Sequence, residues 1–457
     1  MASASADDVR TCLRVLDLAR SGELDETAAL AVERAVADAY RQDKRRRKAR
    51  RAAERAGHDR ALLATAARHR DELPPTSPPD PAREPARAKR AHLGRARRCY
   101  VCREPYRDVD ADYHRLCPPC ARLNAERRTA RCDLSGRRAI VTGGRIRIGF
   151  HLALKMLRDG AEVVVTTRFP TDAARRFAAV SDFASWADRV HVHGMDLLDL
   201  RGVMDFLDRV RDRWRHLDIL VNNAAQTVSR PPGYHRAVLD AEGVPPPGAA
   251  ALVDLIPAAP RGGGALASRA APDLPAVVDL LFPAERTDET GEPLDLRRTN
   301  SWVLRDADVT PREWLEVHVV NAFAPFLLTS RLRPLLEASP FPDRYVVQVS
   351  AMEGSFGRTG TTERHPHTNM AKAALNMLTR TVAEDYRASR IHMNSVDTGW
   401  VTDERPHADK RTARAAGFRP PLDVIDGAAR VYDPIVRGIN GEPVSGLFLK
   451  DYRGVGW

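Results

Sequence analysis

The spacing of apolar residues divides the chain into two parts. Between residues 8 and 40, apolar side chains recur at helical spacing, and the pattern is interrupted at Ser21-Gly22, where Ser21 can cap a second helix. From Asp133 onward, short apolar runs alternate with amphipathic segments, which is the pattern of a parallel sheet covered by helices. The sequence therefore predicts a helical N-terminal segment and an α/β domain with a doubly wound parallel sheet.

The start of the α/β part has the pattern of a strand–turn–helix–strand unit. Residues 138–141 and 162–167 predict strands, and His151–Asp159 predicts the helix between them. The intervening turn, Thr142–Gly149, contains three glycines. Such a turn directs backbone N–H groups and the positive end of the helix toward a pyrophosphate. Only part of the usual glycine pattern is present, so the turn alone is a weak signal.

The length of 457 residues exceeds that of one ordinary domain of about 100–200 residues. We expect a basic helical segment at 1–72, a Pro-rich linker at 73–95, a four-cysteine module at 96–132 and the α/β domain at 133–457, the last with a Pro/Gly-rich insertion at about 229–300. No stretch approaches the roughly 18 apolar residues of a membrane helix, and the first residues lack the features of a secretory signal. We therefore expect a cytoplasmic protein that does not contact membranes.

Basic residues are concentrated in the first third of the chain. The formal net charge is +11, and residues 1–132 contain 30 Lys and Arg against 20 Asp and Glu. Eight of the eleven residues in Arg41–Arg51 are basic. This run could bind nucleic-acid phosphates, but no aromatic residue is interleaved to stack on bases, and a solvated helix face is the simpler interpretation. A protein or nucleic-acid partner for this region remains a hypothesis.

Four of the six cysteines form two C-x2-C pairs separated by 14 residues: Cys99, Cys102, Cys117 and Cys120. Each pair presents two thiolates to one ion, and the spacer allows the pairs to close a tetrahedron. Four thiolates leave no open position, so we predict a structural zinc site without metal catalysis. Two disulfides or a redox dithiol are the alternatives, and a cytoplasmic location disfavours the disulfides.

Motifs from Asp133 to the end resemble, in order, those of the short-chain dehydrogenase/reductase superfamily. The matching positions are Asp196 in Gly-Met-Asp-Leu, Asn223 in Val-Asn-Asn-Ala-Ala, Asn321 in Val-Val-Asn-Ala, Ser350 in Val-Gln-Val-Ser, Lys372 in Ala-Lys-Ala-Ala and Gly399 in Val-Asp-Thr-Gly-Trp-Val. The resemblance implies a Rossmann fold, a dinucleotide cofactor and oxidoreductase activity on a small molecule. It also implies a catalytic Ser350, a Lys372 that holds the nicotinamide ribose, an Asn321 that orders a relay water, and homo-oligomers.

The same resemblance and the charge pattern identify candidate cofactor-binding residues. The second strand ends in Thr166-Thr167-Arg168 without the acidic residue that binds the 2′-OH of NAD, so NADP is favoured, with Arg168 and Arg145 near its 2′-phosphate. Arg147 occupies the position of the second glycine and can offer its guanidinium to the pyrophosphate. The full predicted set is Thr142, Gly143, Gly144, Arg145, Arg147, Ile148, Gly149, Arg168, Asp196, Leu197, Asn223, Ala224, Lys372, Gly399 and Val401.

The main departure from the family pattern is at the catalytic tyrosine. Four residues before Lys372, where the family has a phenol, this chain has Thr368. An alkanol does not replace a tuned phenol as a general acid near neutral pH. His367 is our candidate proton donor, with His365 or a relayed water as alternatives, although His367 could instead cap the start of a helix. We include Thr368 and His367 among the candidate catalytic residues.

A second departure is the 83 residues between Gln226 and Thr310. This insertion leaves the sheet beside the predicted cofactor, so it is either a substrate lid or padding. We expect order at Gln226–Leu239 and Leu294–Val309 and disorder between them.

Two functions remain open. The first is a divergent NADP-dependent oxidoreductase acting on a carbonyl, imine or alkene. The alternative is a non-catalytic NADP-binding scaffold or sensor whose zinc and basic segments dock a partner.

Overall fold

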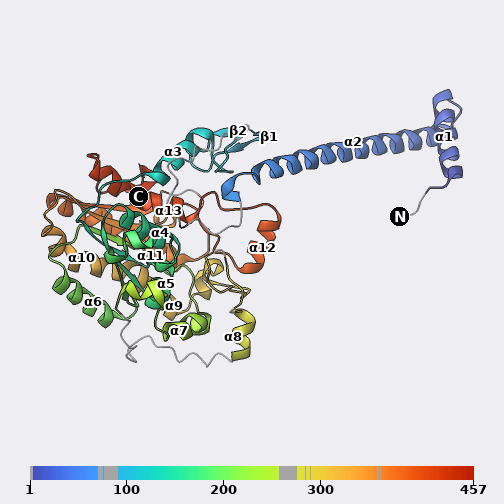
Figure 1. The fold of residues 1–457 in the computed structure, drawn as a ribbon. Coiled ribbons are helices and arrows are strands. Elements are labelled where there is room, and N and C mark those ends of the chain that lie inside the picture. The colour runs from blue at the N-terminus through green and yellow to red at the C-terminus, as the bar shows by residue number, and fades with distance from the viewer. Residues whose placement is uncertain are drawn as a thin grey trace.

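The computed structural model describes residues 4–69, 76, 91–256, 275–283, 285–288, 290–357, 360 and 362–457. Residues 73–90 of the predicted linker, apart from Thr76, and residues 257–274 of the insertion lie outside the described residues. The described chain forms a helical arm, a small four-cysteine module and a large α/β body (Figure 1). This arrangement confirms the predicted fold class.

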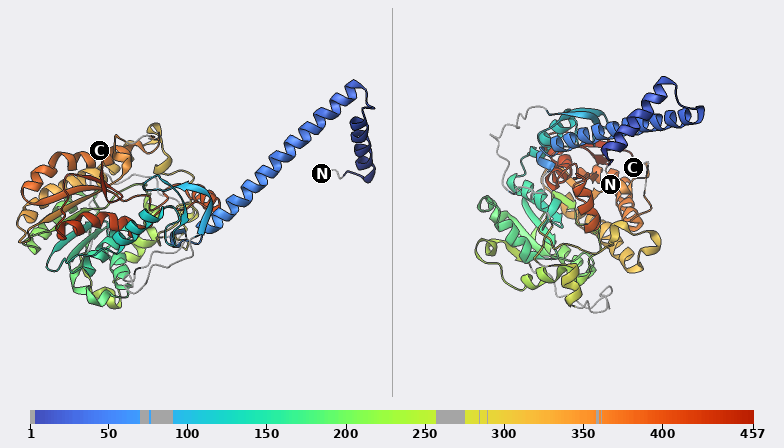
Figure 2. Two further views of the ribbon diagram at one scale, coloured as in Figure 1. Left: turned by 90° about the horizontal axis from the view of Figure 1, so that it is seen from above. Right: turned by 90° about the vertical axis from the view of Figure 1, so that its right-hand side faces the viewer.

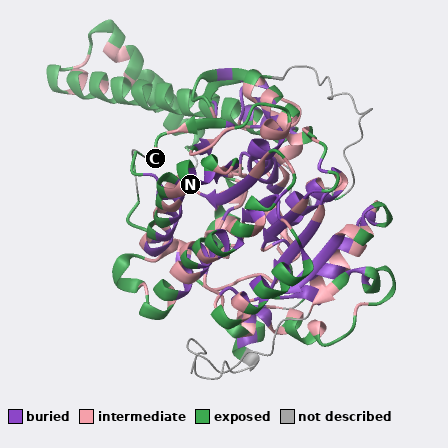
Figure 3. Cartoon of the chain, turned by 90° about the vertical axis from the view of Figure 1, so that its left-hand side faces the viewer, coloured by how far each residue is buried: buried purple, intermediate pink, exposed green. Residues whose placement is uncertain are grey.

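The arm consists of helices α1 (Ala6–Ser21) and α2 (Glu26–Leu63). The side chain of Ser5 accepts the backbone N–H of Asp8 and so caps α1, which ends at Gly22 in the left-handed conformation with φ of 79°. The two predicted helices are present, but Asp25 rather than Ser21 caps the second one, because Ser21 is the last residue of α1. Helix α2 continues through the basic run to the edge of the module. The arm projects from the body, and its surface is almost entirely exposed (Figures 2 and 3).

The four-cysteine module contains an antiparallel pair, β1 (Ala91–Arg98) and β2 (Pro105–Val109), followed by helix α3 (Pro118–Thr129). Its apolar core includes Leu63 from the end of α2 and Leu422 from the α/β body. A module of this size cannot bury much apolar surface by itself. Its core is therefore shared with the segments on both sides of it.

The body is built on a nine-stranded sheet in the order β11-β10-β9-β8-β6-β3-β4-β5-β7. The strands are β3 (Arg138–Thr142), β4 (Glu162–Thr167), β5 (Val190–Gly194), β6 (Ile219–Asn222), β7 (Asp254–Ile256), β8 (Arg344–Ser350), β9 (Ile391–Asp397), β10 (Phe448–Lys450) and β11 (Arg453–Val455). All neighbours pair in parallel except β10 and β11. The chain runs outward from β3 to β5 and then returns to β6, so the strand order reverses between β3 and β6. Open α/β sheets bind ligands at such a reversal.

Helices cover both faces of the sheet. They are α4 (Arg147–Arg158), α5 (Pro170–Ala178), α6 (Leu200–Arg213), α10 (Ala324–Glu337), α11 (Pro366–Ala388) and α13 (Val424–Ile439). Helix α9 (Pro311–His318) packs against α11, and α12 (His407–Ala415) has no buried residues. One core packs α4, α5 and α13 against one face, and a second packs α6, α10 and α11 against the other. Within β3, Ala139 and Val141 belong to the first core and Ile140 to the second. Burial on both faces explains the continuous apolar runs of these strands.

The insertion contains more regular structure than the sequence led us to expect. Helix α7 (Arg236–Glu242) leads to β7, which extends the sheet beside β5, and α8 (Pro275–Leu281) follows on the far side of the undescribed stretch. Asp254 of β7 accepts a hydrogen bond from Arg213 at 2.6 Å and contacts His191 at 3.0 Å. The expectation of disorder between 239 and 294 is therefore wrong for residues 240–256 and for most of 275–293. A free sheet edge beside β5 provides the backbone partners that order β7.

Among the described residues, no helix combines the length and apolar character that crossing a lipid bilayer requires.

Candidate functional site

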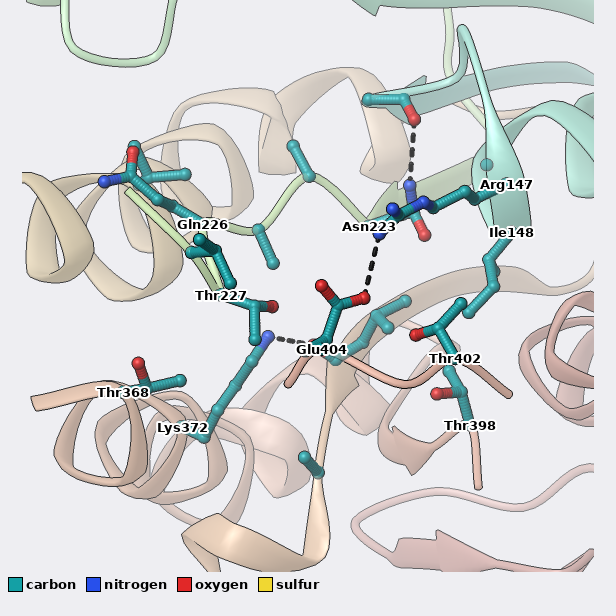
Figure 4. A pocket seen from close by; sticks show the side chains of 18 of the residues that line it. Arg147, Ile148, Asn223, Gln226, Thr227, Thr368, Lys372, Thr398, Thr402 and Glu404 are labelled. Atoms are coloured by element: carbon teal, nitrogen blue, oxygen red, sulfur yellow. Dashed lines mark hydrogen bonds and ion pairs between the residues drawn. The ribbon is translucent and has the colours of Figure 1, made fainter. Parts of the chain in front are cut away.

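A large pocket lies at the carboxyl ends of the central strands. Its cavity volume is about 2210 Å³, and it extends from the glycine turn after β3 to the start of α11 (Figure 4). Side chains after β3, β4, β6, β8 and β9 line it, together with residues of the insertion and of the four-cysteine module. The pocket therefore occupies the reversal of strand order, where most of the predicted site residues meet.

The glycine turn is fixed by the end of β6. The hydroxyl of Thr142 accepts the backbone N–H groups of Asn223 and Ala224, both at 3.0 Å. The amide of Asn223 donates to the carbonyl oxygens of Thr142 at 2.9 Å and Gly143 at 3.1 Å. A Cβ on Gly149 would lie 2.3 Å from the Gly143 oxygen, so only glycine fits there. The turn is thus held open at the start of α4, where backbone N–H groups are available to an anion.

Not all of the predicted glycine-turn residues reach the pocket. Thr142 and Gly144 are absent from its lining, whereas Gly143, Ile148 and Gly149 contribute to it. A Cβ on Gly144 would lie 2.5 Å from a side-chain carbon of Val165 in β4. Thr142 and Gly144 therefore support the turn by contacting the neighbouring strands, β6 and β4.

The two arginines of this turn are engaged in ion pairs. Arg145 is buried and contacts Asp172 at 2.7 Å and Glu292 at 2.6 Å. Arg147 adopts a left-handed conformation with φ of 55° and contacts Glu404 at 3.0 Å (Figure 4). Burial opposes ionisation of Glu404, but Arg147 prevails and lowers its pKa to about 2. Both guanidinium groups were predicted to bind cofactor phosphates. In the structure, carboxylates from other parts of the chain compete for them, and the spacing of these residues in the sequence did not indicate the pairs.

The remaining predicted cofactor-binding residues line the pocket. Arg168 is exposed at its edge, 5.3 Å from the ring of Phe169 and 3.3 Å from a ring nitrogen of His235. Asp196 accepts the backbone N–H of Leu198 at 3.1 Å. The others are Leu197, Asn223, Ala224, Gly399 and Val401. Arg168 therefore places a positive charge at the edge of the pocket, directly after β4.

Three predicted catalytic residues, Ser350, Thr368 and Lys372, line the pocket. Ser350 ends β8, and Thr368 and Lys372 project from the same side of α11 (Figure 4). The hydroxyl oxygens of Ser350 and Thr368 are buried and have no hydrogen-bond partner among the described residues. Lys372 Nζ donates to the Val349 oxygen at 2.8 Å, and burial lowers the pKa of this amine to about 8. Two unpaired buried hydroxyls indicate a place for a polar group of a ligand.

Asn321 does not line the pocket. It lies in a π-helical turn, Val319–Phe323, between α9 and α10. Its side chain accepts the Gln226 N–H at 2.7 Å and donates to the Gln226 oxygen at 3.0 Å. These two hydrogen bonds hold the segment after β6 in place, and the ordering of a relay water by Asn321 stays a prediction. Single π-turns are frequent at functional sites.

The two histidines at the start of α11 have different surroundings. His367 is fully buried outside the pocket lining, and its Nε2 lies 3.4 Å from a carboxylate oxygen of Glu313. His365 lines the pocket, stacks on Trp302 at a centroid distance of 4.1 Å and contacts Asn369 Oδ1 through Nδ1 at 2.9 Å. Burial lowers the pKa of His365, which favours its neutral form. The histidine with access to the pocket is therefore His365, not the predicted His367.

The four predicted zinc ligands form one cluster. The Sγ atoms of Cys99, Cys102, Cys117 and Cys120 all lie within 4.8 Å of one another, with 3.6 Å between those of Cys102 and Cys117. Tetrahedral Zn–S bonds of about 2.3 Å place thiolates about 3.8 Å apart, so the cluster fits a tetrathiolate metal site. His114 is turned away and contacts the Arg419 oxygen at 3.4 Å.

The module also reaches the pocket, which the sequence did not indicate. Tyr100, between the first two cysteines, lines the pocket together with Arg103 and Arg115. The Tyr100 hydroxyl accepts the backbone N–H of Trp400 at 2.9 Å. These contacts join segments 300 residues apart in the chain, so no local spacing could have revealed them.

Comparisons with known proteins match separate parts of the body. A family model described as short chain dehydrogenase matches residues 137–236, and one described as enoyl-(acyl carrier protein) reductase matches 301–417. An uncharacterized protein, R665, of Acanthamoeba polyphaga mimivirus is 33% identical over 350 residues, which cover 74% of this chain and 71% of that protein. The sequence similarity thus extends well beyond the segments matched by the two models.

Several named oxidoreductases match over shorter segments. A probable oxidoreductase of Streptomyces lividans is 41% identical over 93 residues, which are 20% of this chain and 29% of that protein. Carbonyl reductase [NADPH] 1 of Sus scrofa is 38% identical over 88 residues, which are 19% of this chain and 29% of the enzyme. The chain thus spans less than a third of these two relatives. Among solved structures, NADPH-bound carbonyl reductase from chicken fatty liver aligns with a TM-score of 0.45 and 18% identity, covering 71% of this chain and all of that one (100%).

Proposed function

This chain belongs to the short-chain dehydrogenase/reductase superfamily, and we propose that it is an NADP(H)-dependent oxidoreductase acting on a carbonyl, imine or activated alkene. The observation that carries the proposal is the meeting of the braced glycine turn with Ser350 and Lys372 in one pocket. A dinucleotide has the length to connect these two regions. When bound, it supplies or accepts a hydride at its nicotinamide ring.

The cofactor end of the pocket fits a dinucleotide. Gly143 and Gly149 both line the pocket, and they keep the turn tight because a side chain at either position would collide with backbone atoms. Asp196 follows β5 and lines the part of the pocket assigned to the adenine. Gly399 and Val401 follow β9 and line the part assigned to the nicotinamide.

The preference for NADP rests on Arg168. The end of β4 offers this exposed guanidinium and no carboxylate, so a 2′-phosphate is favoured there over a 2′-hydroxyl. Arg145 contributes less than its position in the turn suggests, because Asp172 and Glu292 already neutralise it.

The catalytic end of the pocket supports polarisation of a substrate oxygen or nitrogen. The unpaired hydroxyls of Ser350 and Thr368 are buried and therefore available as hydrogen-bond donors to that atom. Lys372, fixed through the Val349 oxygen, carries positive charge at neutral pH and donates its remaining protons toward the pocket.

A proton must be supplied when a carbonyl is reduced, and Thr368 is too weak an acid to provide it. His365 is our candidate donor, in place of the buried His367. Asn369 Oδ1 accepts the Nδ1 proton and Trp302 stacks on the ring, so His365 donates a proton from Nε2 only in its imidazolium form, which burial disfavours by lowering the pKa of His365.

Binding and turnover of the purified protein test the proposal. Titration with NADPH and NADH should give tighter binding of NADPH, and a panel of aldehydes, ketones, imines and activated enones should include a substrate that oxidises it. Lys372→Ala should weaken NADPH binding and abolish turnover, whereas His365→Asn should lower turnover by roughly 10²- to 10⁴-fold with little change in NADPH affinity. Absence of NADPH and NADH binding would contradict the assignment.

A second candidate function is an NADP-binding scaffold without turnover. It is favoured by Thr368 in place of the tyrosine. In this case NADPH binds, no member of the panel is reduced, and the arm or the cysteine module engages a protein or nucleic-acid partner. The exposed basic stretch of α2 is available for such contact.

We assign a structural zinc ion to the four-cysteine cluster. Its four sulfur ligands leave no coordination position for a substrate, and the small core of the module needs additional stabilisation. We also propose that copies of the chain associate into a homo-oligomer, as is common in the superfamily.

A further inference from the structure

We infer that the four-cysteine module is one wall of the nucleotide pocket and that Tyr100 is a positioning residue through which metal loading controls the nicotinamide end of the site. The inference rests on the proposed function, because it assigns the loop after β9 to the nicotinamide. It goes beyond that function by giving the metal site a role in cofactor binding.

The module is rigidly attached to the body beside the pocket. Arg128 of α3 forms two hydrogen bonds with Asp423, at 2.6 and 2.9 Å, and a third with Asp426 at 2.8 Å. The hydroxyl of Tyr113 donates to Asp426 at 2.8 Å. Asp426 is fully buried, so this contact is shielded from water and salt. The module therefore holds a fixed position relative to the N-terminus of α13.

The loop after β9 lies between the module and the pocket. Thr398, Gly399, Trp400, Val401 and Thr402 all line the pocket. On its other side, Val401 packs against the core of the module, to which Leu422 of the body also belongs. The loop therefore lines the pocket on one side and packs against the core of the module on the other.

Tyr100 makes a polar contact between the four-cysteine module and the loop after β9. Its hydroxyl accepts the Trp400 N–H at 2.9 Å, and Gly399, with φ of 77°, turns the loop next to it. Tyr100 therefore fixes the loop by accepting this backbone hydrogen bond.

A bound metal ion fixes the position of Tyr100. Tyr100 lies in the turn between Cys99 and Cys102, whose thiolates would hold two of the four corners of the metal site. Without a metal ion, four thiols within 4.8 Å have little to keep their turns in register, and structural zinc sites commonly fold only when loaded. Loss of metal thus releases the loop, while the glycine turn on the opposite side of the pocket keeps its own braces.

The loop after β9 depends on the module, whereas the glycine turn does not, and the experiment measures this difference. Tyr100→Phe removes only the hydroxyl, and Tyr106→Phe is the matched control, because the Tyr106 hydroxyl donates to the His114 oxygen at 2.9 Å inside the module and away from the pocket. Affinities for NADPH and for adenosine 2′,5′-bisphosphate, which lacks the nicotinamide half, are measured on the zinc-loaded proteins. Tyr100→Phe should weaken NADPH binding about three- to tenfold and leave the bisphosphate unchanged. Tyr106→Phe should change neither.

Metal removal and hydrogen exchange complete the test. Cys120→Ser should reproduce the selective loss of NADPH affinity, and amide exchange in residues 398–402 should accelerate in both Cys120→Ser and Tyr100→Phe but not in Tyr106→Phe. Unchanged exchange in Tyr100→Phe, or equal losses for NADPH and the bisphosphate, would overturn the inference. If the wild-type protein binds neither nucleotide, the proposed function fails, while the exchange data still decide whether the module fixes the loop.

Discussion

Replacing Glu292 with glutamine tests whether acidic residues around the glycine turn weaken phosphate binding. Glu292 contacts Arg145 at 2.6 Å and Arg176 at 3.4 Å, and Asp172 contacts the same two guanidinium groups at 2.7 and 2.6 Å. Two cations and two anions leave this cluster without net charge. Glu292→Gln keeps the shape of the side chain and leaves the cluster with one unbalanced positive charge.

The size of the effect follows from Coulomb's law. If a phosphate charge binds about 8 Å from the unbalanced cation, it gains about 2 kcal/mol at an effective dielectric constant of about 20, and about 0.5 kcal/mol at the dielectric constant of water, about 80. We therefore expect NADPH to bind roughly 2- to 30-fold more tightly. NADH should gain less, because it lacks the 2′-phosphate. The gain should shrink when salt is raised to about 0.15 M, where the Debye length is about 8 Å.

The assay is calorimetric titration of both nucleotides at low and physiological salt. Asp182→Asn is the control, because Asp182 pairs with Arg158 at 2.7 Å outside the pocket lining and should leave both affinities unchanged. Unaltered or weaker NADPH binding by a folded Glu292→Gln protein would refute the electrostatic argument.

Three further predictions concern the metal, the cofactor and pH. Purified protein should carry about one zinc per chain by elemental analysis, and Cys117→Ser should lose it; metal-free wild-type protein under reducing conditions would disprove the site. Arg168→Ala should remove most of an expected 10- to 100-fold preference for NADPH while leaving NADH binding nearly unchanged, so equal wild-type affinities would exclude the assigned role. Burial lowers the pKa of Lys372 to about 8, so its ammonium form is lost above that pH; NADPH affinity should then fall by up to about tenfold per pH unit, and a flat wild-type profile from pH 7 to 10 would contradict ammonium binding.

The sheet was predictable from the sequence because its strands are buried on both faces. Residues 162–167 form β4 as predicted, and residues 138–141 form all but the last residue of β3. The helix expected at His151–Asp159 instead begins at Arg147, because the turn closes directly onto the helix. Strand β7 was missed, because three residues in an irregular insertion pair only where β5 offers a free edge.

The candidate site was predictable only where its residues belong to sequence motifs. Ser350 and Lys372 follow from such motifs and line the pocket together. The carboxylate of Glu404 on Arg147 and the hydroxyl of Tyr100 on Trp400 join distant segments, so neither has a local signal. The two histidines at the start of α11 differ in position by only two residues, yet only His365 lines the pocket, and no spacing rule predicts this difference.

The measurement that tests the central claim most directly compares NADPH oxidation by wild-type protein and Thr368→Tyr across the same carbonyl panel. Thr368 lines the pocket one helical turn before Lys372, and Ser350, whose hydroxyl is also unpaired among the described residues, lines the same pocket. If the protein is an oxidoreductase, the wild type oxidises NADPH with at least one substrate, and restoring the phenol changes that rate, because it adds a general acid worth roughly 10²- to 10⁴-fold. Tight NADPH binding with no oxidation by either protein would contradict the enzymatic account and leave a nucleotide-binding scaffold.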